Sequence, residues 1–366
     1  MPRTTAPGPH VRRWTGAATA TATATVTAAI ASLALLAGCA GDATDATEAS
    51  GPPGETQALT LYNGRSEELV GPLLEQFTAA TGIDVEVRSA GSGELAAQLL
   101  TEADASPADV FLSQDAGALG ALTNAGLLAP LPGATLERIP AAYRAEDGTW
   151  TGLSGRVRVI VYNPNQVAAA PDTIDALVTG EYAGGRIGYA PTNASWQSFV
   201  TGLRVLRGED GAREWLEAFA EQDPVPFEGN SQVRDAVDAG QVALGLVNHY
   251  YLYELIAEKG EKEVAARNQF MAPGDPGGLV NVAGAGILAS TDQADEAQAL
   301  IDFLVSDQAQ RYFAEQTREY PLVDSVPAPM GLPALDDLDA PALDLSDLDS
   351  IAQTQALLAE VGLLTQ

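Results

Sequence analysis

Positive charge, cysteine and histidine are all scarce in this sequence. Its 366 residues contain 19 Lys and Arg against 49 Asp and Glu, a net charge of −30, with one cysteine and two histidines. Because nucleic acids bind clustered positive charge, this balance excludes a nucleic-acid-binding protein. A single cysteine excludes an intrachain disulfide, thiolate metal sites and a redox pair, so zinc, copper and iron–sulfur centres lose their usual ligands. Hydrophobic residues still make up 46% of the chain, which predicts a soluble, acidic protein with a core.

Residues suited to catalysis are also few. His10 falls in the N-terminal leader, so His249 is the one imidazole left in the rest of the chain. The sequence has no P-loop, no G-x-G-x-x-G motif and no G-x-S-x-G nucleophile elbow, to which residues 152–155 come nearest without matching. A Ser-His-Asp triad would have to use His249, and paired carboxylates keep a glycosidase open. We therefore expect no enzymatic activity, with a secreted hydrolase as the alternative from another class.

The N-terminus has the pattern of a secretion signal. Arg12 and Arg13 precede an uncharged run, residues 15–38, whose second half is strongly apolar. A transmembrane anchor is the alternative, but the first half of the run alternates Ala and Thr and is only weakly apolar. The run ends in Leu-Ala-Gly-Cys, residues 36–39, which resembles a bacterial lipobox and contains the single cysteine. This resemblance implies a lipoprotein signal peptide over 1–38 and a lipid on Cys39, which anchors the protein to the outer face of the cell membrane.

The rest of the chain divides into a tether and an α/β body. Residues 39–57 contain no large apolar residue, which predicts a disordered tether. From residue 58 onward, strand and helix patterns alternate, and this alternation predicts parallel α/β sheets. The strands are expected at 59–62, 83–87, 109–112, 158–162, 187–189 and 242–247, and the helices at 69–81, 94–100, 197–206, 212–221, 297–313 and 351–364. The acidic stretch around 336–349 lacks the EF-hand spacing, and we interpret it as a solvated linker.

Two polar strings follow predicted strands at the edge where open α/β sheets bind ligands. Asn248, His249, Tyr250 and Tyr251 come directly after the strand at 242–247. Functional tyrosines and tyrosines that pack under a helix are equally good interpretations of this string. Residues 190–196 follow another strand and begin a helix, whose free N–H groups suit an anion, although simple N-capping by Asn193 or Ser195 explains the same pattern.

Six motifs, in order along the chain, resemble ferric-ion-binding proteins, the solute receptors of bacterial ABC iron importers. They are residues 61–69, 106–111, 152–156, 190–193, 248–251 and 319–322. The resemblance implies an α/β, two-lobe, periplasmic-binding-protein-like fold of type II. Each lobe is a mainly parallel sheet with flanking helices, and hinge strands between the lobes allow closure around the ligand. It assigns residues 58–155 and 285–325 to lobe 1, and 156–284 and 326–366 to lobe 2.

The resemblance also implies a ligand set. Tyr250 and Tyr251 match the phenolate ligands of Fe(III), a hard cation that anionic oxygen suits. An anion, carbonate or phosphate, would complete the shell at the positions that match Asn193, Ala194, Ser195, Asn230 and Asn248. The family's histidine falls on Ser66, its glutamate on Gln114, and a third tyrosine of some branches on Trp196. Substitute metal ligands are sought in Asp115, Glu67 and His249, and further anion ligands in Arg65 and Arg156.

Together these features predict a monomeric lipoprotein receptor that captures Fe(III) and delivers it to an ABC permease and its ATPase. The alternative keeps the receptor and changes its ligand to a phosphonate, another oxyanion or a polyamine. A polyamine needs facing carboxylates and an aromatic box, for which Trp150, Trp196 and Asp115 are the candidates.

Overall fold

A ten-stranded mixed sheet organises the part of the chain that the computed structural model describes, residues 58–364. The predicted signal peptide, the tether and the lipidation of Cys39 lie outside the described residues. The strands follow the order β2-β1-β3-β9-β4-β7-β5-β6, and β8 and β10 pair with β4. Their bounds are β1 (Leu59–Asn63), β2 (Val85–Ser89), β3 (Val110–Ser113), β4 (Thr151–Tyr162), β5 (Ile187–Tyr189), β6 (Val225–Pro226), β7 (Leu244–Asn248), β8 (Arg267–Gln269), β9 (Val280–Ile287) and β10 (Tyr320–Pro321).

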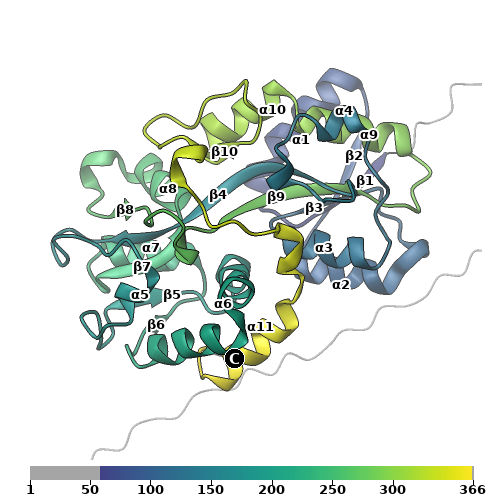
Figure 1. Ribbon diagram of the computed structural model, residues 1–366. Helices are drawn as coiled ribbons and strands as arrows, with labels where there is room; N and C mark the ends of the chain where they lie inside the picture. Colours follow the sequence, from purple (N-terminus) through teal and green to yellow (C-terminus); the bar gives the residue numbers. More distant parts are fainter. Residues whose placement is uncertain (1–57, 365–366) are drawn as a thin grey trace, which may run out of the picture. The chain divides into compact units, whose positions relative to one another are not determined.

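The sheet has two parallel parts joined by two long strands. At one end β1 pairs in parallel with β2 and β3, and at the other β5 pairs in parallel with β6 and β7. Between them β9 and β4 run antiparallel to each other, β9 is antiparallel to β3, and β4 is antiparallel to β7. Figure 1 shows β4 and β9 passing from one part to the other. The expected α/β fold, with a mainly parallel sheet in each half and connecting strands between them, is confirmed.

Helices cover both faces of each part (Figure 1). In the first part α1 and α9 lie on one face and α2 and α3 on the other; in the second part α7 and α8 lie opposite α6 and α11. Their bounds are α1 (Glu67–Thr81), α2 (Ser92–Glu102), α3 (Ala116–Asn124), α4 (Gly133–Leu136), α5 (Ile174–Leu177), α6 (Ala194–Ala220), α7 (Asn230–Asp238), α8 (Tyr250–Lys259), α9 (Ala294–Leu304), α10 (Asp307–Tyr312) and α11 (Ile351–Glu360). Among residues 58–364 no helix is both long and apolar enough to cross a membrane.

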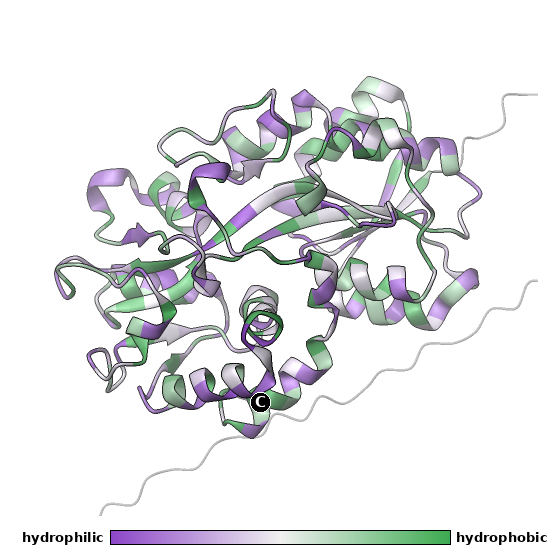
Figure 2. Cartoon of the chain, in the orientation of Figure 1, coloured by the Kyte–Doolittle hydropathy of each residue, from purple (hydrophilic) through white to green (hydrophobic). Residues whose placement is uncertain are grey.

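Each part has its own apolar core, and Figure 2 shows hydrophobic residues concentrated on the strands and on the helix sides that face them. Phe77, Phe111 and Trp150 are fully buried in the first part. In the second part the rings of Trp215 and Phe219 stack with centroids 5.1 Å apart. Burial of rings of this size dominates the energetics of a core, so each part has an independent source of stability.

The two helices predicted at 197–206 and 212–221 are confirmed: they form α6, and Gly208, with a φ of 74°, breaks the helical path between them. Two other predicted elements differ from the structure. The single helix at 297–313 is two helices, because the Ser306 side chain accepts a hydrogen bond from the Ala309 N–H and starts α10. The acidic stretch is not simply a solvated linker, since Leu345 and Leu348 are buried in the first core.

Candidate metal centre

Two adjacent tyrosines begin helix α8, directly after strand β7 and His249. Tyr250 is 5% exposed and Tyr251 is half-buried. Their rings stack with centroids 4.5 Å apart and 29° between the ring planes. Both side chains line a cavity of about 340 Å³ between α1, the loop after β3, α7 and α8. The complete lining is Arg65, Ser66, Glu68, Leu69, Gln114, Ser231, Tyr250, Tyr251 and Glu254.

The protonation state of the Tyr250 hydroxyl depends on its burial and on the charged groups near it. Burial raises the pKa of Tyr250 well above its ordinary value, the neighbouring Tyr251 raises it further, and the charge of Arg156 acts in the opposite direction. Desolvation penalises a lone phenolate, so without a bound cation the hydroxyl stays protonated. A bound metal ion favours the deprotonated form instead, because its positive charge stabilises the phenolate directly.

Arg156 carries a buried charge whose hydrogen-bonding capacity is unused. It lies on β4 opposite Asn281 of β9, is 1% exposed, and none of its three guanidinium nitrogens has a hydrogen-bond partner among residues 58–364. Burial lowers the pKa of Arg156, and Tyr250 and Glu319 are among the groups that oppose this shift. The Nδ2 atom of Asn281 is unpaired as well. Buried donors without partners are costly, and a bound anion would satisfy them.

Arg65, the other predicted anion ligand, is already paired. Its Nη2 donates to both carboxylate oxygens of Glu319 at 2.9 Å, and its Nη1 donates to Ser154 Oγ at 3.2 Å. Thr317 Oγ1 also donates to Glu319 at 2.9 Å. Arg65 contributes its charge to the cavity wall, but most of its donors serve this buried ion pair.

Three of the predicted anion ligands lie in one hydrogen-bonded cluster at the start of α6. Asn193 caps the helix, and its Oδ1 accepts from Ser195 N at 3.0 Å and from Ser195 Oγ at 2.7 Å. Asn230 Nδ2 donates to Ser195 Oγ at 2.9 Å and to Asn193 Oδ1 at 3.2 Å. Ala194 is the first residue of α6. Asn248 ends β7 and is 1% exposed, and its Nδ2 has no hydrogen-bond partner in the part of the chain that the structure describes.

Arg158 was missed from the sequence and supports this cluster. It pairs in register with Asn248, and its Nη1 donates to the backbone oxygen of Ser195 at 2.9 Å. Its Nη2 donates to the backbone oxygen of Leu246 at 3.1 Å. Burial lowers the pKa of Arg158 to about 9, and Tyr251 opposes this shift. The available signal was the spacing: Arg156 and Arg158 are two residues apart on one strand and therefore share a face.

The other metal-ligand candidates separate into two groups. Ser66 and Gln114 line the cavity, Ser66 exposed and Gln114 half-buried. Asp115 does not line it; its Oδ1 accepts from Ala118 N at 3.2 Å and caps α3, and burial raises the pKa of its carboxyl group. Glu67 lines a different groove, between α1 and β2.

His249 is not available to a metal. Its Nδ1 accepts from Val157 N at 3.2 Å, and its Nε2 lies 2.7 Å from the backbone oxygen of Arg318, which requires the Nε2–H tautomer. Burial lowers the pKa of His249 to about 4. Both ring nitrogens are therefore occupied by backbone groups, and the idea that His249 substitutes for a missing ligand is wrong.

Glu254 is a second residue that the sequence analysis missed. It lies on α8, one turn after the tyrosines, and lines the same cavity. Burial raises the pKa of Glu254 to about 7, and Arg234, 3.5 Å away, opposes this shift. The sequence does place Glu254 at a helical spacing from Tyr250 and Tyr251, which puts the three residues on one face of the helix. Only the structure shows that this face of α8 lines the cavity. Within residues 58–364 no group of three or more His, Cys, Asp and Glu side chains is arranged to hold a metal.

Comparison with known proteins shows the family to which this chain belongs. Residues 105–345 match the family described as bacterial extracellular solute-binding proteins. The chain is 37% identical to the Fe(3+)-binding periplasmic protein of Serratia marcescens over 84% of this chain and 91% of that protein. It superposes on iron-bound HitA from Pseudomonas aeruginosa with a TM-score of 0.78 and 33% identity, covering 83% of this chain and 99% of that one. For Trichodesmium IdiA (FutA) in complex with iron and citrate, the TM-score is 0.72 and the identity 29%, with coverage of 84% and 99%. The chain therefore has the two-lobe type II fold and belongs to the bacterial extracellular solute-binding proteins, among their ferric-ion-binding members.

Proposed function

We propose that the protein captures Fe(III) outside the cytoplasm and delivers it to an ABC permease and its ATPase, without catalysing a reaction. The observation that carries this proposal is the stacked pair Tyr250 and Tyr251 at one cavity, with the unpaired Arg156 acting on Tyr250. Ferric ion is a hard, highly charged acid that prefers anionic oxygen. Its charge favours phenolate far below the free tyrosine pKa of about 10. The ferric-iron-binding relatives support the same cargo.

A synergistic anion completes the proposed iron shell. The unpaired donors of Arg156 and Asn248, together with the N-terminus of α6 at Ala194 and Ser195, suit carbonate or phosphate. Citrate, which accompanies iron in the Trichodesmium structure, is a further anion of the same chemistry. Two tyrosines leave most of a six-coordinate shell to such an anion, to water or to further protein groups.

We also propose that the receptor acts as a monomer held at the outer face of the membrane by the lipid on Cys39. The lipobox resemblance and the apolar leader support the anchor. One lipid-modified cysteine carrying two chains holds a protein stably at a membrane, where a single chain would not.

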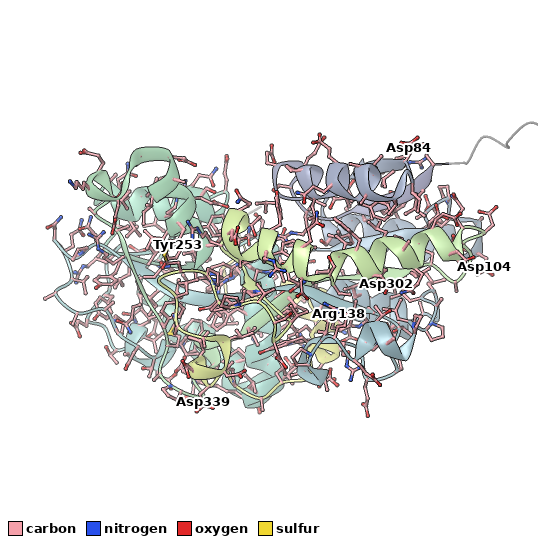
Figure 3. All side chains as sticks on the ribbon, turned by 90° about the horizontal axis from the view of Figure 1, so that it is seen from above. Asp84, Asp104, Arg138, Tyr253, Asp302 and Asp339 are labelled. Atoms are coloured by element: carbon pink, nitrogen blue, oxygen red, sulfur yellow. The ribbon has the colours of Figure 1, made fainter. Side chains whose placement is uncertain are left out.

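The experiment that tests the cargo is a titration of the iron-free full-length chain with ferric citrate, followed by visible absorbance. We expect a phenolate-to-iron charge-transfer band in the wild type that weakens in both Tyr250→Phe and Tyr251→Phe. Tyr253→Phe is the matched control, because Tyr253 lies on the same helix (Figure 3) and does not line the cavity. A folded wild type without a band, or an equal loss of absorbance in the control, would refute the iron proposal.

One observation favours a second candidate ligand, an oxyanion without a metal. Arg156 offers three unpaired nitrogens, and the lobe-one positions Ser66 and Gln114 are neutral. A calorimetric titration of the iron-free chain with inorganic phosphate distinguishes the two cases, since saturable binding without iron and no visible band with iron would support a phosphonate or related oxyanion. A polyamine receives no support, because Trp150 and Trp196 are fully buried in the cores and line no part of the cavity.

A further inference from the structure

We propose that Glu254 supplies a carboxylate oxygen to the bound ferric ion, as a third protein ligand beside Tyr250 and Tyr251. This inference rests on the proposed function. The cavity lining contains two carboxylates, Glu254 and Glu68, and of these Glu68 is exposed on the first turn of α1. On the opposite wall Ser66 and Gln114 carry no charge. The wall formed by α8 is therefore the one that brings an anionic carboxylate to the tyrosines.

The position of Glu254 on the helix makes a shared ligand set possible. It lies four residues after Tyr250 and three after Tyr251, spacings at which side chains of an α-helix are neighbours on one face. All three line the same cavity. The Glu254 side chain is 35% exposed, so it is not fully enclosed by its neighbours.

Few contacts hold the Glu254 carboxylate in place. Among residues 58–364 its one ion-pair contact is with Arg234, at a long distance of 3.5 Å from Nη1. Arg234 has other partners: Asp235 at 3.0 Å from Nε, the backbone oxygen of Tyr251 at 3.1 Å and Glu258 at 4.0 Å. Loss of Glu254 from this group leaves the Arg234 charge compensated, so the rearrangement costs little.

Charge balance is compatible with the same assignment. Two phenolates and one carboxylate neutralise a trivalent cation. Arg156, whose guanidinium nitrogens have no hydrogen-bond partner among residues 58–364, can then offset a negative charge of a bound anion.

The test is a ferric titration of the full-length chain as the wild type, as Glu254→Gln and as Glu258→Gln. Glu258 is the matched control because it lies one turn further along α8, also approaches Arg234, and does not line the cavity. We expect Glu254→Gln to shift the charge-transfer band to longer wavelength, since iron with one anionic ligand fewer attracts electrons more strongly. We also expect its affinity in competition with citrate to fall about 10- to 100-fold, with Glu258→Gln unchanged, by analogy with other losses from metal shells.

The outcomes separate this inference from the function on which it rests. A wild type without a band ends both. A wild-type band that is unchanged in position and affinity in Glu254→Gln ends only the assignment of Glu254, as does an equal loss of affinity in Glu258→Gln. Glu254→Asp keeps the charge and should bind iron more tightly than Glu254→Gln; if it binds no better, or if Glu254→Gln also lowers the unfolding temperature of the iron-free chain, Glu254 has a structural role and the assignment is overturned.

Discussion

His249 and Arg156 are both buried, and they differ in what their polar atoms do. The ring nitrogens of His249 both contact backbone groups, so the side chain joins β4 to the segment before β10. The three nitrogens of Arg156 have no partner among the described residues. A satisfied buried group stabilises the fold, whereas an unsatisfied one is costly unless a ligand completes it. His249 therefore stabilises the fold, and Arg156 stays the proposed ligand of a bound anion.

The hydrogen bonds of His249 predict how stability depends on pH. The pKa of its imidazole is about 4 in the folded chain, against an ordinary value of 6.5. Between these values the unfolded chain binds a proton that the folded chain does not, so stability rises with pH. Lowering the pH from 7 to 5 should remove about 2 kcal/mol through this group. Urea unfolding at both pH values measures the loss.

The variant His249→Asn isolates this contribution, because Glu319, Arg156 and the other ionisable groups that act on the histidine are unchanged in it. Its stability should depend less steeply on pH than that of the wild type. A variant whose free energy of unfolding changes with pH as much as the wild type would show that His249 does not cause the effect.

For single residues, the sequence predicts which side chains lie at the site better than it predicts which groups those side chains contact. Tyr250 and Tyr251 could be selected because they follow a strand directly, and the structure places both at one cavity; their role as iron ligands stays a prediction. Arg158 and Glu254 could not be selected in the same way. Their importance depends on contacts with Ser195 and with the cavity, which join segments far apart in the sequence.

At the scale of elements, the C-terminal segment packs closely on helix α3. Gly117 and Gly120 of α3 face the backbone of residues 345–349, and a Cβ atom added at Gly117 would collide with the backbone oxygen of Leu348. Leu345 and Leu348 are buried in the same contact. This apolar contact could not be predicted from the sequence, because six Asp residues among Leu and Pro are equally typical of a solvated linker.

This contact predicts that Gly117→Ala loosens the C-terminal segment. Overpacking of a closely fitted contact typically costs about 1–3 kcal/mol, and we expect a loss of stability in that range. Gly93→Ala is the matched control: Gly93 is the second residue of α2 as Gly117 is of α3, nothing approaches its added Cβ within 4 Å, and the helix should gain at most about 0.5–1 kcal/mol. Thermal unfolding measures both. Equal stability of the two variants would mean that the contact with Leu348 contributes nothing.

For the whole molecule, strand and helix alternation is a local pattern, and the sequence therefore predicts the α/β class correctly. The order of the strands is not local: β9 lies between β3 and β4 although more than a hundred residues separate it from either. The excess of acid lies at the surface, where Asp84, Asp104, Asp302 and Asp339 are exposed (Figure 3). Among residues 58–364 the buried charged side chains include more arginines than acids, so the interior around the cavity differs electrostatically from the acidic surface.

The proposed iron cavity is lined by both parts of the sheet, so iron bound there should stabilise the whole folded body. A ligand that binds only the folded chain stabilises it by about 2.7 kcal/mol at a free concentration 100 times its Kd. For a body of this size that corresponds to a rise in unfolding temperature of about 4 °C. Calorimetry with and without ferric citrate measures the rise.

Gallium(III) has the same charge as ferric ion and gives no charge-transfer band, so it should raise the unfolding temperature without producing colour. Tyr250→Phe combined with Tyr251→Phe should lose most of the rise with either metal while Tyr253→Phe keeps it, and a full rise in the double variant would place the metal elsewhere on the protein.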